Sequence, residues 1–155
     1  MKSWLALLAL LFTAPGLTLA ADDIVVHDVW VRAAPPGATV LAAYLNIDNR
    51  SASAQALSGA SSPQFDSVEI HRTEIKNGVA SMSAQPRVAI PAHGSLSFEP
   101  NGYHLMLIGP HKALHAGDHV ELHVQFDGQP DQLIHAPVRA DDAPADDMTH
   151  HHHHD

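Results

Sequence analysis

The sequence has 155 residues, no cysteine and a formal net charge of −9 when its fourteen histidines are neutral. This negative charge disfavours nucleic acid and anionic membranes as partners and favours metal cations or basic protein surfaces. The lack of cysteine excludes disulfides, thiol chemistry and a blue-copper centre, which needs a cysteine ligand. The fold must therefore rest on a packed core, which about 115 residues can supply.

The first twenty residues predict a signal peptide. Lys2 gives a positive start, and the apolar run at residues 4–12 is too short to span a bilayer. The small-x-small tripeptide at residues 18–20 predicts cleavage after Ala20, so we expect an exported chain that begins at Ala21. The alternative, a retained membrane anchor, is disfavoured by the short apolar run. No later apolar run could cross a membrane, so we expect no membrane insertion after cleavage.

Residues 21–140 predict a single all-β domain made of short strands. The expected strands are 24–32, 39–48, 54–60, 67–75, 79–84, 87–90, 95–98, 103–108, 118–126 and 132–139. They are rich in β-branched and aromatic residues, and turn residues separate them. No window shows a helical period over ten or more residues. This pattern indicates an antiparallel β-sandwich or barrel.

The dipeptide Asn77-Gly78 predicts a two-residue hairpin with a type I′ turn. In that register Thr73 faces Met82. His71 and Met82 then share one face of the hairpin as diagonal neighbours, roughly 7–8 Å apart at the backbone.

The predicted strand at residues 103–108 presents a second pair of the same kind. Tyr103, Leu105 and Leu107 form its more apolar face, so His104 and Met106 point together to the other side. Neutral imidazole and thioether ligands suit Cu(I) and offer none of the carboxylate or thiolate that Zn(II), Ca(II) or Mg(II) favours. The alternative is that the methionines fill the core and the histidines lie on the surface.

The candidate ligands have the spacing H-x10-M-x21-H-x-M, which resembles the signature of the periplasmic PCuAC-type copper chaperones. Further segments in the expected order are residues 30–37, 42–44, 68–71, 102–107 and 114–118. The resemblance implies a cupredoxin-like Greek-key β-sandwich that binds one Cu(I) through four side chains, which we call the His–Met set. These are His71, Met82, His104 and Met106.

The resemblance also implies a partner and a compartment. Such proteins act in the Gram-negative periplasm and deliver copper to the CuA centre of cytochrome c oxidase. The expected acceptor is therefore oxidase subunit II or another copper chaperone of its assembly, and the carrier is expected to be a monomer.

Residues 141–155 form an Asp- and His-rich tail without an apolar pattern, so we expect them to be disordered. The tail offers a possible secondary Cu(II) site made of one methionine and five consecutive histidines. These are Met148, His150, His151, His152, His153 and His154. A purification tag is the alternative, but five histidines followed by Asp155 favour a native metal-capturing extension.

The remaining histidines carry weaker signals. On the strand predicted at 118–126, His119, Glu121 and His123 face outward as a weak Cu(II) or Zn(II) site or, as we prefer, a solvated face. We expect His27, His93 and His135 to be structural or exposed.

The sequence shows no motif for nucleophilic catalysis or phosphate binding, so we expect no enzyme activity. Copper storage or detoxification, with the tail as a second reservoir, remains the alternative to the chaperone function.

Overall fold

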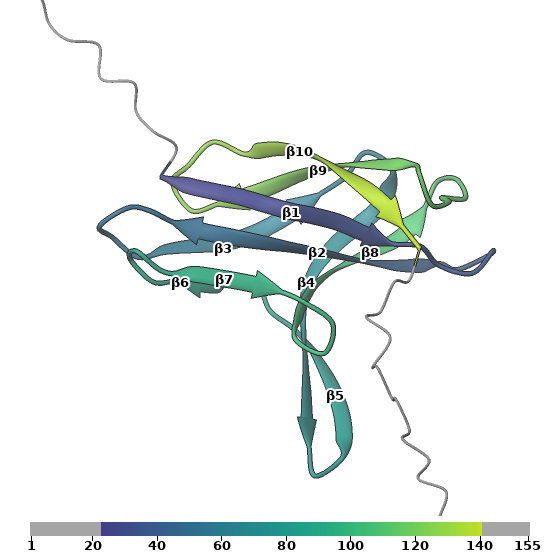
Figure 1. Ribbon diagram of the computed structural model, residues 1–155, viewed down its shortest axis with the longest axis horizontal. Helices are drawn as coiled ribbons and strands as arrows, with labels where there is room; N and C mark the ends of the chain where they lie inside the picture. Colours follow the sequence, from purple (N-terminus) through teal and green to yellow (C-terminus); the bar gives the residue numbers. More distant parts are fainter. Residues whose placement is uncertain (1–22, 141–155) are drawn as a thin grey trace, which may run out of the picture.

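The computed structural model describes residues 23–140, which form ten strands and no helix (Figure 1). The strands are β1 (Ile24–Arg32), β2 (Val40–Asn49), β3 (Gln55–Ser61), β4 (Phe65–Lys76), β5 (Val79–Ala84), β6 (Val88–Ile90), β7 (Ser95–Phe98), β8 (Tyr103–Pro110), β9 (His119–Phe126) and β10 (Gln132–Arg139). The predicted signal peptide at 1–20 and tail at 141–155 lie outside the described residues. Within residues 23–140 no helix is long and apolar enough to cross a membrane.

The strands are hydrogen-bonded in the order β5-β4-β8-β7-β2-β1-β10-β9-β3-β6. The sheet folds over between β1 and β10, so that its two halves enclose a single hydrophobic core (Figure 1). This arrangement confirms the predicted all-β sandwich. Two short pairings, β1 with β10 and β7 with β8, are parallel, whereas the other pairings are antiparallel.

Side chains on the central strands alternate between the core and the outside. Leu105 and Leu107 on β8 are fully buried, and Val120, Leu122 and Val124 on β9 are equally inaccessible. Because successive side chains of a strand point to opposite faces, His104 and Met106 lie on the face opposite Leu105 and Leu107, as predicted, although His104 is itself buried, with 7 % of its surface exposed.

The β4–β5 hairpin extends away from the two layers (Figure 1). Both turn residues have positive φ, 53° at Asn77 and 76° at Gly78, as a type I′ turn requires. The ladder pairs Thr73 with Met82, which confirms the predicted register. This register places Met82 on the hairpin face that also carries His71.

Gly109 occupies a backbone conformation near the end of β8 that favours glycine. Its φ is +66°, and a Cβ added there would overlap the carboxylate of Asp66. We expect Gly109→Ala to lower the free energy of unfolding by about 1–3 kcal/mol, because a side chain in the left-handed region costs about 1–2 kcal/mol before any clash. Urea denaturation followed by circular dichroism would measure the change.

Gly37→Ala is the matched control for this variant. Gly37 has a φ of +83° but nothing within 4 Å of the added Cβ, so it tests the backbone effect alone. A larger loss at position 109 than at position 37 is expected. Equal losses would show that Asp66 moves aside without cost.

Candidate metal centre

Three neighbouring strands bring the His–Met set to one face of the sheet. His71 lies on β4, Met82 on β5, and the other two members on β8. The β4–β8 ladder pairs His71 directly with His104, and their ring centroids are 6.0 Å apart with the planes tilted by 40°. All four side chains therefore project from adjacent strands at the β5–β4–β8 edge.

One nitrogen of His71 is held by a hydrogen bond and the other is free. Nε2 lies 2.8 Å from Oε2 of Glu69, whereas Nδ1 is buried and has no hydrogen-bond partner among residues 23–140. An ionised carboxylate can only accept, so in the neutral ring Nε2 carries the proton and donates it to Glu69. Nδ1 is left with a lone pair that can bind a metal.

In His104 the other ring nitrogen, Nδ1, makes the hydrogen bond. Its Nδ1 donates to the carbonyl oxygen of Gly102 at 3.2 Å, which leaves Nε2 with the lone pair. Burial lowers the pKa of His104, and the charge of His71 lowers it further, although the bond to Gly102 opposes both effects. A lowered pKa favours the neutral ring, which is the form that can bind a metal.

The two candidate thioether ligands lie on the same face of the sheet as the histidines. Met82, His104 and Met106 line one pocket of about 360 Å³, whose remaining lining comes from residues 32–35 and 40–42. Met106 is half-buried, whereas Met82 on the protruding hairpin is 53 % exposed. The lining is apolar except for Arg32 and His104, and so it favours an uncharged ligand set that includes sulfur. His71 lies outside this lining, next to His104.

Outside the His–Met set, residues 23–140 hold further histidines and carboxylates, the side chains that usually form metal-binding clusters. Among the described residues, no three His, Asp or Glu side chains are placed to hold one ion. His123 Nε2 lies 3.0 Å from Glu121 Oε1 on β9, and both side chains are more than a third exposed, so the preference for a solvated face there stays a prediction. His93 and His135 are exposed, and His27 contacts the carboxylates of Asp28 and Asp48. The tail ligands, Met148 and His150 to His154, lie outside the described residues.

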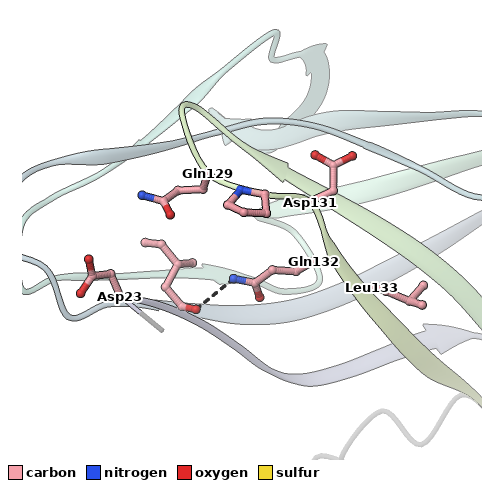
Figure 2. Close-up of a pocket in the computed structure, with 7 residues that line it drawn as sticks. Asp23, Gln129, Asp131, Gln132 and Leu133 are labelled. Atoms are coloured by element: carbon pink, nitrogen blue, oxygen red, sulfur yellow. Dashed lines mark hydrogen bonds between the residues drawn. The ribbon is translucent and has the colours of Figure 1, made fainter. Parts of the chain in front are cut away.

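Another hollow lies at the opposite end of β1 from the candidate metal centre (Figure 2). It has a volume of about 380 Å³ and is lined by Asp23, Ile24 and residues 129–133. Gln132 closes one side by donating from Nε2 to the carbonyl oxygen of Ile24 at 3.0 Å (Figure 2). No histidine or methionine lines it, so it offers none of the soft ligands that Cu(I) prefers.

Three features of the centre were missed by sequence reasoning. Glu69 could have been found, because it lies two residues before His71 and so shares its face of the strand. The carbonyl of Gly102 and the wall at residues 32–35 carry no local signal, since both depend on how distant strands pair.

Comparison with solved structures supports the fold. The Cu(I)-bound form of DR1885 from Deinococcus radiodurans is 30 % identical, with a TM-score of 0.63, and the match covers 79 % of this chain and 81 % of that one. The copper-bound PCuAC domain from PmoF2 is 24 % identical with a TM-score of 0.66, over 78 % of this chain and 96 % of that domain. The cupredoxin-like sandwich implied by the sequence is thus confirmed.

Sequence comparison places the chain in a family. Lxx21020 of Leifsonia xyli subsp. xyli (strain CTCB07), whose name describes it as a lipoprotein, is 32 % identical over 120 residues, which are 77 % of this chain and 71 % of the relative. The model of the LpqE-like family, also described as lipoproteins, matches residues 24–138. The protein therefore belongs to the LpqE-like family, and its fold is that of the PCuAC domains.

Proposed function

We propose that this protein is a copper chaperone that binds one Cu(I) ion through the His–Met set and gives it to an apo-metalloprotein. The observation that carries the proposal is the state of the two imidazoles. Each has one nitrogen fixed by a hydrogen bond and the other left with a lone pair, and the two rings face each other beside two thioethers. The likeness to DR1885, which was solved with Cu(I), supports copper as the cargo.

The geometry favours a carrier over a permanent cofactor site. Met82 stands on an exposed hairpin, so an incoming ligand from a partner could replace its thioether without unfolding the sandwich. Because all four proposed ligands are uncharged, release of the metal does not strand a charged side chain in the buried part of the site. The thioethers also need no deprotonation, so their contribution to binding should persist at acidic pH.

The resemblance to PCuAC-type chaperones suggests where the copper goes. We infer delivery to the CuA centre of cytochrome c oxidase, through subunit II or another chaperone of its assembly, by a monomeric carrier in the periplasm. Export is supported by the signal peptide predicted at residues 1–20 and by the lipoprotein descriptions of the relatives. The sequence contains no cysteine, so none of its residues offers a thiol to which a lipid could be attached.

Metal stoichiometry tests this proposal against copper storage. The mature chain and a version lacking residues 141–155 would each be titrated anaerobically with Cu(I) against a chromophoric chelator, and separately with Cu(II). We expect one tight Cu(I) in both proteins and extra, weaker Cu(II) only where Met148 and the five tail histidines are present. Several tight Cu(I) ions per full chain would favour storage. A shortened chain without tight Cu(I) would exclude the His–Met set.

A further inference from the structure

Glu69 occupies a position that the proposed copper site does not yet explain. It lies two residues before His71 on β4 and pairs with Met106 across the β4–β8 ladder, so it lies between two of the proposed ligands. Its side chain is 49 % exposed, whereas that of His71 is 14 % exposed. The carboxylate thus reaches from the solvent side to a mostly buried ring.

We propose that Glu69 is a positioning residue that makes Nδ1, and not Nε2, the copper-binding atom of His71. This inference rests on the proposed function and adds a residue to its site. By accepting the Nε2 proton, Glu69 fixes both the tautomer and the orientation of the ring. The buried Nδ1 has no other partner in the described residues, so nothing else there selects this tautomer.

The two histidines of the set are held by acceptors of different strength. Gly102 offers His104 a neutral carbonyl at 3.2 Å, whereas Glu69 offers His71 a charged carboxylate at 2.8 Å. A hydrogen bond to an ionised acceptor is about twice as strong as a neutral one. It also raises the electron density on the opposite nitrogen, so Glu69 should make His71 the more strongly donating imidazole.

The chain contains a second glutamate that bonds a histidine two residues later on the same strand. Comparing the two pairs shows that this spacing alone does not make a metal site. On β9, Glu121 Oε1 lies 3.0 Å from His123 Nε2, again two residues apart on one strand face. Both of those side chains are more than a third exposed, and within residues 23–140 they belong to no group of three or more His, Asp or Glu side chains that could hold an ion. Of these two pairs, the Glu69–His71 pair is the one that leaves a buried nitrogen without a hydrogen bond beside another imidazole.

The test uses the full chain labelled with ¹⁵N-histidine, without metal. Spectra would be recorded at about pH 8.5, two units above the ordinary histidine pKa of about 6.5, so that the rings are neutral. A His71→Gln variant assigns the His71 signals. We expect His71 to carry its proton on Nε2 in the parent and to show a mixture of tautomers in Glu69→Leu. Glu69→Gln, which keeps an amide oxygen as acceptor, should restore most of the parent pattern.

The second part of the test measures the Cu(I) affinity of the same proteins by chelator competition. We expect Glu69→Leu to weaken binding about 10–100-fold, because loss of an outer partner of a metal ligand has effects of that size. Glu69→Gln should weaken it less. The matched control is Glu121→Leu, which should change the His123 signals and leave Cu(I) affinity within about twofold of the parent.

Three outcomes would overturn the inference. One is an unchanged His71 tautomer in Glu69→Leu, and another is a changed tautomer with unchanged affinity. The third is an equal loss of affinity in Glu121→Leu, which would indicate a general effect of surface charge. A parent chain without tight Cu(I) would overturn the proposed function itself, whereas tight Cu(I) in the parent and in Glu69→Leu alike would overturn only the role of Glu69.

Discussion

The double variant Met82→Leu, Met106→Leu is expected to lose tight Cu(I) binding and to keep its fold. Leucine has nearly the volume of methionine but no sulfur lone pair, so the change removes two soft ligands and little packing. Affinity should fall at least about 100-fold, because even residues that only support a ligand are worth about 10–100-fold. The free energy of unfolding of the metal-free protein should change by less than about 1.5 kcal/mol per substitution.

Chelator competition and urea denaturation would measure these two quantities on the same samples. Ile108→Leu is the matched control, since it alters the same face of β8 two residues beyond Met106 without removing a proposed ligand. It should leave Cu(I) affinity unchanged. If the double variant bound Cu(I) as tightly as the parent, both methionines would be packing residues, and metal binding would rest on the histidines and the tail.

Local signals account for the parts of the site that the sequence predicted well. Asn77-Gly78 determines the turn, the turn determines the register, and a side-chain period of two then places Met82 on the face of His71. The same period separates Met106 from the buried Leu105 and Leu107 on β8. Each of these steps uses residues close together in the chain, so no knowledge of the tertiary fold is needed.

Other parts of the site depend on pairing between distant segments. His71 faces His104 only because β4 pairs with β8 in one particular register, and no turn links these strands directly. The wall at residues 32–35 likewise requires the end of β1 to lie beside the start of β2 and the end of β10. Hydrophobic alternation determines which face of a strand is buried, but it does not identify the neighbouring strand.

The burial of Asn49 also could not be predicted from nearby sequence alone. The second predicted strand ends at residue 48, so the sequence places Asn49 among the turn residues between strands, and such residues are usually exposed. In the structure Asn49 ends β2 and is only 2 % exposed, which makes it one of two buried polar side chains among the described residues. Its role depends on β6 and on the loop after β2, which meet only in the folded chain.

The variant Asn49→Ala is expected to lower the free energy of unfolding by about 3–5 kcal/mol, the largest stability effect predicted for this protein. The Nδ2 group of Asn49 donates to the carbonyl oxygens of Ser53, Ile90 and Pro91 at 2.9, 3.2 and 2.9 Å. Its Oδ1 accepts from the backbone N–H and the hydroxyl of Ser51 at 3.0 and 2.7 Å. Alanine would remove these five bonds. Ser51 Oγ and the Gly94 N–H still donate to the carbonyl oxygens of Ser53 and Pro91, but each buried group that is left unpaired costs about 1–3 kcal/mol.

Asn46→Ala on the same strand is the control for this prediction. The Asn46 amide makes one long bond, 3.3 Å, to the exposed carboxylate of Asp28, so its loss should change the free energy of unfolding by less than about 0.5 kcal/mol. Urea denaturation would measure both variants. Asn49 lies at the opposite end of β2 from Ala42, which lines the metal pocket, so folded Asn49→Ala protein should keep its Cu(I) affinity. If Asn49→Ala lost as little unfolding free energy as Asn46→Ala, water would be replacing the Asn49 amide. The loop after β2 and β6 would then be held together by their packing alone.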